Sequence, residues 1–236
     1  MDEEYHIRAL LDSLKKQQQS VTKMARAGKI TYMEAGKRAA KMGETTGKLV
    51  LEHLAKLYPE GSVGRDEALR VIQPALKSAH DYAARLAGVA QSEVNREAGV
   101  GLKPLLPEFD KKRVALLAEE LAQVEDLAMS DGGFVQGVKQ FMLQSIDDAI
   151  RMNAEAHERA GMQVRITRMY DGIGVHNRKE PCEWCLDRVM SQVTLEEAYD
   201  RGAFERHPGC GCPVIYTSAR GETTVRGRGG QWTAWR

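Results

Sequence analysis

The sequence Pro181-Cys182-Glu183-Trp184-Cys185 is followed, after an intervening segment, by His207-Pro208-Gly209-Cys210-Gly211-Cys212. These two stretches contain all four cysteines of the chain. A Cys-x2-Cys turn places two thiolates on one side of a tight loop, and a Cys-x-Cys pair with a nearby His supplies two or three more ligands. A tetrahedral structural zinc ion takes such a set, at roughly 2.3 Å to sulfur and roughly 2.0–2.1 Å to nitrogen. We therefore predict that zinc holds together a small C-terminal module that buries too little apolar surface to fold unaided.

Five residues compete for the four positions around such an ion. The candidate ligands are Cys182, Cys185, His207, Cys210 and Cys212. The set could consist of four thiolates, or of three thiolates and the imidazole, with His207 replacing Cys210 or Cys212. Because Cys210 and Cys212 are two residues apart, both reach one ion only if Gly211 turns the backbone sharply. The sequence leaves these sets open.

Two other cysteine chemistries fit the sequence less well. Disulfides would explain the even number of cysteines, but the acidic start Met1-Asp2-Glu3-Glu4 is not followed by the apolar segment of a secretory signal. Persistent disulfides are also uncommon in a reducing compartment. Pro181-Cys182-x-x-Cys185 matches half of the signature of zinc nucleotide deaminases. The His-x-Glu half is missing, since His157 and Glu158 are adjacent, so we favour a structural zinc site.

The composition indicates two differently built regions. There are 34 Lys and Arg against 33 Asp and Glu, a formal net charge of +1, so no overall field favours nucleic acid or an anionic membrane. No stretch approaches the roughly 18 consecutive apolar residues of a membrane span. We therefore expect no membrane partner and a chain that is soluble and intracellular when synthesised. All three Trp residues lie in the last quarter with the cysteines, whereas the earlier part is rich in Ala, Leu, Lys, Glu and Gln.

Apolar residues recur at helical spacing through the first region. We predict helices over residues 3–28, 32–57, 66–97, 110–128 and 134–160, with Ser130-Asp131-Gly132-Gly133 as a break before the last. Thr31 and Glu34 fit a capping box, and Pro74 predicts a kink or a fresh start. None of these helices carries a convergent set of His, Asp or Glu. We expect an α-helical region over residues 1–161 that docks onto assembly partners and offers a surface for self-association.

After Gly161 the apolar period changes to that of strands. We predict strands over residues 164–170, 213–217 and 222–226, the last two joined around Gly221, and a short helix over residues 195–201. The expected fold class is α+β, with a β-rich, zinc-stapled module over residues 162–217. A Gly-, Arg- and Trp-rich tail over residues 218–236 could stack on single-stranded nucleic acid. Docking onto another protein is the commoner use of such Trp and Arg residues.

Several spaced motifs resemble one family of phage proteins. They are Arg165, Tyr170-Asp171-Gly172, His176, Pro181-Cys182-Glu-Trp184-Cys185, Gly202-x-Phe204 and Arg206-His207-Pro208-Gly-Cys210-Gly-Cys212, continuing to Tyr216. This pattern resembles the C-terminal half of tailed-phage minor head proteins, the head-morphogenesis family that includes the phage Mu protein F-like proteins, particularly members from phages and prophages of Gram-positive bacteria. The resemblance covers residues 164–217. The helical region is similar only in its general architecture.

The resemblance implies a minor capsid protein of the virion head, present in few copies and acting at the portal vertex during head morphogenesis in the host cytoplasm. The partners it implies are the portal protein, the major capsid or scaffold protein, and DNA during packaging or ejection. It implies no established catalytic activity, and we expect the chain not to be an enzyme.

Two alternative functions stay open. A nucleic-acid-binding zinc module would use a basic face formed by Arg165, Arg168, Arg178, Lys179, Arg206, Arg220, Arg226 and Arg228. From Met162 onward the chain has eleven Lys and Arg against nine Asp and Glu, an excess too small to make DNA the expected main partner. A metal-dependent nuclease would use His176-Asn177 beside the cysteines. Catalytic zinc keeps an open position, whereas this site has more candidate ligands than a closed ion needs.

Overall fold

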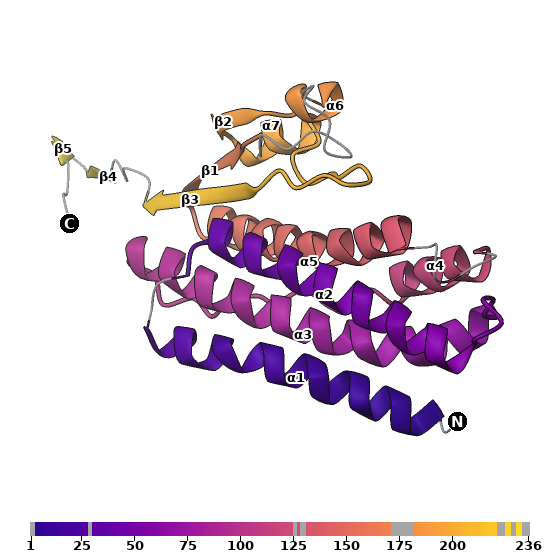
Figure 1. Ribbon diagram of the computed structural model, residues 1–236. Coiled ribbons are helices and arrows are strands. Elements are labelled where there is room, and N and C mark those ends of the chain that lie inside the picture. The colour runs from indigo at the N-terminus through magenta and orange to yellow at the C-terminus, as the bar shows by residue number, and fades with distance from the viewer. Residues whose placement is uncertain are drawn as a thin grey trace.

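The computed structural model describes residues 3–27, 30–124, 127, 131–170, 182–220, 225–227 and 230–232 (Figure 1). Within these residues five helices come first: α1 (Glu3–Ala27), α2 (Tyr32–Leu57), α3 (Arg65–Glu97), α4 (Lys111–Ala122) and α5 (Asp131–Arg159). The C-terminal part contains β1 (Met162–Arg168), α6 (Glu183–Leu186), β2 (Met190–Val193), α7 (Leu195–Asp200), β3 (Val214–Arg220), β4 (Val225–Gly227) and β5 (Gly230–Trp232). The predicted α+β class, with helices ahead of a small sheet, is confirmed.

The long helices lie side by side, and the C-terminal sheet covers one side of them (Figure 1). α2 packs against both α3 and α5, while α1 lies on the opposite side from the sheet and contacts α3. Two glycines let α2 approach α5 closely. A Cβ added at Gly43 would lie 2.7 Å from the Cα of Lys139, and one at Gly47 would lie 3.0 Å from the Cα of Val135. This contact therefore depends on the absence of side chains.

The start of α2 matches its prediction only in part. Thr31 is the N-cap residue, and its hydroxyl accepts a hydrogen bond from the backbone N–H of Glu34 at 3.2 Å. The Glu34 carboxylate accepts instead from the guanidinium of Arg38 at 2.6 Å. Half of the predicted capping box is therefore formed, and the remaining carboxylate contributes an ion pair within the helix.

The structure has no fresh start at Pro74 and no helix break at Asp131-Gly132-Gly133, so these two predictions are wrong. α3 continues unbroken through Pro74, although a proline inside a helix costs about 3 kcal/mol. Its neighbours Ile72 and Ala75 are fully buried, so tertiary packing holds the helix together. α5 begins at Asp131, so Gly132 and Gly133 belong to the helix rather than to a break before it. The long apolar period that follows outweighs the low helix propensity of two glycines. α4 in turn ends at Ala122, earlier than predicted.

The sheet has three antiparallel strands in the order β2-β1-β3. β1 pairs along its whole length with β3, with Ile166 opposite Tyr216. On its other edge it pairs with β2, where the register shifts and Gln192 adopts a φ of 55°. β2 is not predicted from the sequence, because it is four residues long and irregular.

Among the described residues, the strands on either side of Gly221 are not paired with each other. β3 pairs with β1, and β4 pairs with β5, with Val225 opposite Trp232. Gly221 and much of the 218–236 tail lie outside the described residues.

Sheet and helices share one core. Val164, Ile166 and Val214 pack in the same buried cluster as the apolar residues of α2, α3 and α5. Hydrogen bonds reinforce this contact: the hydroxyls of Tyr216 and Tyr32 both donate to Gln91 Oε1 on α3, at 2.8 Å and 2.6 Å. The sheet is therefore fixed on the helices by apolar burial and by satisfied buried polar groups.

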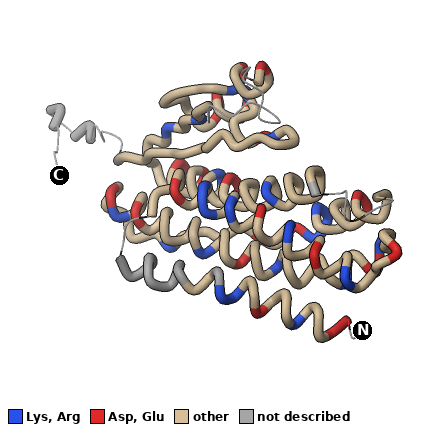
Figure 2. Tube along the Cα trace, viewed as in Figure 1, with Lys and Arg blue, Asp and Glu red and all other residues tan. Residues whose placement is uncertain are grey.

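Charged side chains of both signs are interspersed along the helices (Figure 2). Many form exposed pairs within one helix, such as Lys48 with Glu44 at 2.7 Å. Such pairs contribute about 0–1 kcal/mol each, so they keep the surface solvated rather than hold the fold. Among the described residues, no helix is both long and apolar enough to span a membrane.

Candidate metal centre

Cys182 and Cys185 lie on the first of two turns that face each other. Cys182 is the N-cap of the single-turn helix α6, and its carbonyl accepts from the backbone N–H of Leu186 at 2.9 Å. Residues three apart lie on the same side of a helical turn, which brings the two sulfur atoms together. Cys185 is buried and Cys182 is half-buried.

The second turn is formed by residues 207–210. The N–H of Cys210 donates to the carbonyl of His207 at 3.1 Å. Pro208 occupies the second position, and Gly209 occupies the third with a φ of 81°. Proline followed by a residue with positive φ is the pattern of a type II turn. The positive φ in this segment is at Gly209 and not at Gly211, and the sulfur atoms of Cys210 and Cys212 nevertheless lie in one group of donors.

All five candidate ligands converge, in two groups that share Cys185. The donor atoms of Cys182, Cys185 and His207 lie within 4.8 Å of one another, and so do those of Cys185, Cys210 and Cys212. Cys185 Sγ is 3.7 Å from Cys210 Sγ and 2.9 Å from His207 Nε2. Cys182 Sγ is 3.4 Å from the same nitrogen. The predicted convergence of the two turns is confirmed, and these residues could hold a metal ion.

Two of these separations, 3.7 Å between Cys185 and Cys210 and 3.4 Å between Cys182 and His207, are close to those around a tetrahedral ion, while the 2.9 Å between Cys185 and His207 is shorter. Bond lengths of roughly 2.3 Å to sulfur and 2.0–2.1 Å to nitrogen place neighbouring sulfur atoms roughly 3.8 Å apart, and sulfur and nitrogen roughly 3.6 Å apart. All four cysteines are free thiols, and 3.7 Å between Cys185 and Cys210 far exceeds a disulfide bond of roughly 2.05 Å. The donors thus lie at ligand spacing rather than at bonding distance to each other.

His207 has the tautomer of a metal ligand. Its Nδ1 is 2.8 Å from the carbonyl oxygen of Pro208, which can only accept, so Nδ1 carries the hydrogen. Nε2 faces Cys182 and Cys185 and is the nitrogen that a metal ion would bind. A metal-bound histidine characteristically donates its other ring N–H to a carbonyl or carboxylate in this way.

Trp184 covers the imidazole from outside. The rings of Trp184 and His207 meet edge to face, with centroids 4.9 Å apart. The guanidinium of Arg188 lies 3.7 Å from the Trp184 ring centroid, a cation–π contact on the indole. Trp184 therefore separates His207 from solvent on this side and links the first turn to the second.

Arg168 approaches the cluster from the last residue of β1. It is fully buried, and its guanidinium donates to the carbonyls of Ala203 and Glu205, at 2.6 Å each, and to Cys210 Sγ at 3.3 Å. A buried arginine stays protonated and needs a negative charge nearby. A hydrogen bond from Cys212, together with the charges of Arg206 and Arg168, lowers the pKa of the Cys210 thiol. Cys210 is thus held toward the thiolate form that binds metals.

A buried ion pair connects the second turn to α5. Arg206 Nε and a terminal nitrogen donate to the two carboxylate oxygens of Asp147, at 2.5 Å and 2.9 Å. The two side chains are 3% and 1% exposed. Burial raises the pKa of Asp147 and the charge of Arg206 opposes that change; this bidentate contact identifies an ionised pair. Arg206 also donates to the Cys210 carbonyl at 3.3 Å.

Two glutamines on the same face of α5 extend this connection. The side-chain amide of Gln140 donates to the carbonyl of His207, and that of Gln144 donates to the carbonyl of Phe204 at 3.3 Å. Gln140, Gln144 and Asp147 are spaced by four and three residues, so they form one row along the helix. The ligand-bearing turn is therefore anchored on the helices by a row of polar contacts.

Arg168 and Asp147 are site residues that the sequence prediction of the metal centre missed. The alternating pattern of β1 contains a signal for Arg168. Arg168 lies two residues after Ile166 and four after Val164, so all three share the buried face of the strand. Asp147 gives no such signal, since its partner lies 59 residues away in sequence. His176, Asn177, Arg178, Lys179 and Pro181 lie outside the described residues.

Comparisons with protein-family models, with curated proteins and with solved structures found no match for this chain. Function must then be inferred from the donors themselves. Thiolates with an imidazole suit zinc and other thiophilic metals, whereas magnesium and calcium take oxygen ligands. The five residues thus offer the donor chemistry of a site for a thiophilic metal.

Proposed function

We propose that this chain is a minor head protein of a tailed phage, acting in head morphogenesis at the portal vertex, and that a structural zinc ion staples its C-terminal part. The observation that carries the proposal is the convergence of Cys182, Cys185, His207, Cys210 and Cys212 from two separate turns. The order and spacing of the motifs around these residues support the phage family. The helical part supports an assembly role by providing long exposed surfaces for partners.

A structural ion fits the surroundings better than a catalytic one. Five donors compete for four positions, so no position needs to be left to water. In the described part of the chain, the charged groups that hydrogen-bond to the second turn are the guanidiniums of Arg168 and Arg206. These groups compensate thiolate charge and cannot act as a general base. The carboxylate of Asp147 is fully engaged by Arg206.

The bound zinc would cross-link the turn at residues 182–185 to the turn at residues 207–212. Because the second turn is also tied to α5, the cross-link would make the outer part of the module rigid with respect to the helices. Portal, capsid and scaffold proteins are the proposed partners, and a rigid docking block suits them because it loses little conformational entropy on binding.

The nucleic-acid alternative loses two of its proposed contacts. Arg168 is fully buried, and the side chain of Arg206 is 3% exposed and paired with Asp147. Neither guanidinium is available to a phosphate. Phosphate contacts would also make the affinity fall steeply with salt, so DNA binding that is unchanged from low to moderate salt would exclude this alternative as the main function.

The proposed function is tested by co-expression with the portal protein of the same phage. We expect the zinc-loaded chain to co-purify with the assembled portal ring through size exclusion. Its Cys185→Ser variant should associate less, because the C-terminal part loses its staple. A folded, zinc-loaded chain that binds neither portal nor capsid nor scaffold protein would contradict the proposal.

A further inference from the structure

β3 is an edge strand that stays open to pairing. It forms one end of the sheet order β2-β1-β3, and its hydrogen-bonded partner is β1. Within the described residues, no backbone group from residues 214–220 bonds to any segment other than β1. An edge strand of this kind presents a row of unpaired N–H and C=O groups.

The two edges of the sheet differ in how they are protected. β2, at the other edge, has four residues, a register shift and a positive φ at Gln192. Such irregularities block the addition of another strand. β3 is seven residues long, and its sequence Val214-Ile-Tyr-Thr-Ser-Ala-Arg220 has no proline and no charge before its last residue. β3 itself therefore lacks the proline, the internal charge and the register shift that protect other edge strands from pairing.

Two cavities lie between β3 and the start of α2. The first, of 420 Å³, is lined mainly by apolar groups, including Gly36, Ile146 and Val214. The second, of 570 Å³, is lined by Val94, Ile215 and Tyr216 among others. Tyr32 and Met33 line both, so the cavities are neighbours along the strand.

The two cavities are reached at successive positions along β3. One is reached at Val214 and the other at Ile215 and Tyr216. Side chains on one face of an added strand recur every second residue, roughly 7 Å apart. A strand paired with β3 would therefore place side chains i and i+2 over the two cavities. Alternate side chains in pockets are how edge-strand recognition obtains specificity.

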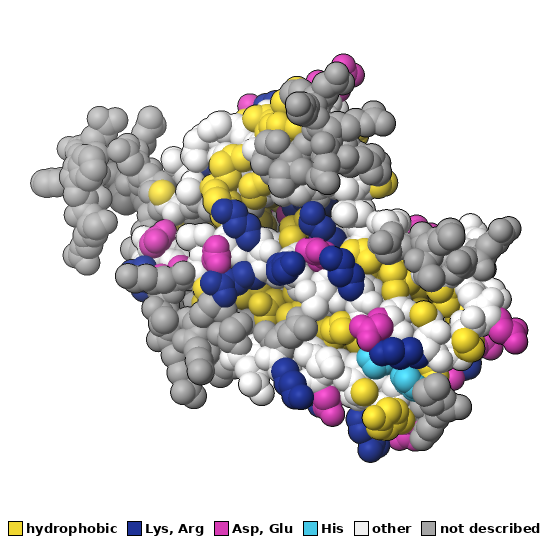
Figure 3. Space-filling view, in the orientation of Figure 1, with side chains coloured by type: hydrophobic (Ala, Val, Ile, Leu, Met, Phe, Trp, Pro, Cys, Tyr) yellow, Lys and Arg dark blue, Asp and Glu magenta, His cyan; other side chains and the backbone are white. Residues whose placement is uncertain are grey.

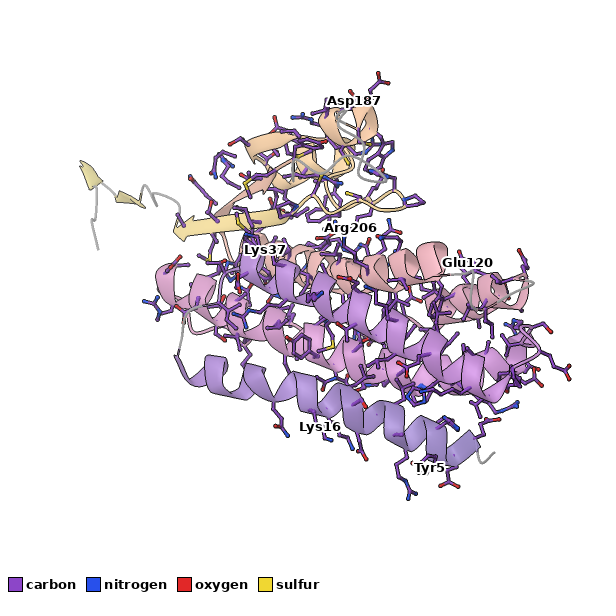
Figure 4. All side chains as sticks on the ribbon, in the orientation of Figure 1. Tyr5, Lys16, Lys37, Glu120, Asp187 and Arg206 are labelled. Carbon is purple, nitrogen blue, oxygen red and sulfur yellow. The ribbon has the colours of Figure 1, made fainter. Side chains whose placement is uncertain are left out.

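The two cavities differ in the charged side chains that line them. Lys37 and Lys139 line the first cavity, and neither has an ion-pair partner in the part of the chain that the structure describes. At the second cavity Arg96 is paired with Glu93 at 2.7 Å. Lys and Arg side chains gather along the seam between the C-terminal part and the helices (Figure 3). Figure 4 shows Lys37 and Arg206 in this seam.

We propose that the β3 edge and these two cavities form a docking site for an extended segment of a partner protein. The segment adds to the sheet beside β3, places apolar side chains i and i+2 in the cavities, and carries an acidic residue at the end next to Lys37 and Lys139. This inference does not depend on the head-protein function, and it names only the chemistry of the bound segment.

The test selects binders from a random peptide library displayed on yeast, using the full-length, zinc-loaded protein. We expect the selected peptides to share an apolar-x-apolar pattern with Asp or Glu at one end. A synthetic peptide of the selected sequence is then titrated by fluorescence anisotropy. Zinc content is measured on the same sample, so that a missing metal and a missing peptide site give different results.

Two variants and two controls locate the bound peptide. Gly36→Leu fills the first cavity, where a Cβ would make only a 3.9 Å contact with Leu143, and it should weaken binding at least about tenfold. Gly133→Leu, where a Cβ meets nothing within 4 Å, should bind as wild type. Lys37→Glu should also weaken binding, and the exposed Lys112→Glu on α4 should not.

Several results would overturn the proposal. These are a library that yields no binder, selected peptides without the expected pattern, and equal affinity of wild type and Gly36→Leu. Dimerisation of the free protein through β3 would show that a second copy occupies the edge. Binding of decanoate at the cavities, without binding of any peptide, would show a small-ligand site instead.

Discussion

The helices and the outer half of the C-terminal part are held together in different ways. Between the helices, long side chains such as Leu54, Leu76 and Ile150 are completely buried in a continuous core. Beyond the sheet, the buried cluster consists of Cys185, Cys210 and Cys212, with Tyr170, Cys182 and Trp184 packed on it. The first region has enough apolar burial to fold by the hydrophobic effect. The second has a handful of thiols and a buried arginine, which a metal ion would turn into a stable arrangement.

The contrast indicates that apolar burial holds the helices together, whereas the fold of the outer C-terminal part would depend on a bound metal ion. β1 and β3 belong to the helical core through Val164, Ile166 and Val214. Within residues 182–212, the apolar residues Met190, Leu195, Ala198, Ala203 and Phe204 also belong to that core, whereas the cysteine-bearing turns form a separate buried cluster. Substitutions on one side of this contrast should show whether the other side responds.

The largest effect is expected from Cys185→Ser, because Cys185 belongs to both groups of donors. Structural zinc sites contribute on the order of 10 kcal/mol of binding energy to folding. The variant should lose its metal, and protease should cut between residues 182 and 212 while the helical circular dichroism persists. Leu186→Ser, an exposed neighbour on the same turn, is the control. If Cys185→Ser resisted protease as well as the wild type, a metal ion would not be what holds the two turns together.

Asp147→Ala tests the connection between the two regions. It leaves the Arg206 guanidinium buried without its partner, which should lower the free energy of unfolding by about 3–5 kcal/mol. Asp148→Ala removes the adjacent carboxylate, which is 33% exposed and pairs with Arg151, and should cost at most about 1 kcal/mol. Urea unfolding followed by circular dichroism distinguishes the two. Equal effects of both substitutions would mean that the buried pair does not anchor the turn.

Within the helical region, replacing either of two glycines of α2 by alanine should change the stability of the protein, in opposite directions for the two positions. Gly43→Ala forces a Cβ against the backbone of Lys139, and overpacking of this kind should cost about 1–3 kcal/mol. Gly36→Ala makes only an ordinary contact and should stabilise α2 by up to about 1 kcal/mol. Thermal unfolding of both variants checks the signs. Similar destabilisation by both would show that the close contact at Gly43 is not what orders α2 against α5.

The smallest effect concerns pH. Burial lowers the pKa of His80 and His157 in the folded helices, so the unfolded chain binds more protons as the pH falls below roughly 6.5. The helices should be most stable above that pH and lose stability as it falls. His80→Asn should flatten this slope between pH 7.5 and 5.5, measured by urea unfolding. An unchanged slope in the variant would show that His80 does not carry the effect.

Most of the helical architecture can be predicted from apolar spacing, and the metal centre from cysteine spacing, because both signals are local. Thr31 and the stripe of α5 each indicate an element through residues close in sequence. The short strand β2 cannot be predicted, since four residues with a bulge leave no alternating pattern. Likewise, nothing near β3 in sequence shows that its partner is β1.

Contacts between distant segments explain the remaining errors. The closeness of Gly43 to Lys139 depends on how two helices cross, which neither helix specifies alone. The ion pair of Asp147 with Arg206 joins α5 to a turn far along the chain. Even the turn at Gly209 is decided by the preceding proline, Pro208, rather than by the spacing of the cysteines. Sequence spacing identified the candidate ligands, and the structure was needed to find what surrounds them.

The most direct test of the central claim is zinc-edge X-ray absorption, with elemental analysis, on protein purified under reducing conditions. We predict one zinc per chain, with sulfur ligands at roughly 2.3 Å, at most one nitrogen at roughly 2.0–2.1 Å, and no bound water. A metal-free chain whose residues 182–212 are nevertheless folded and resistant to protease would contradict the account.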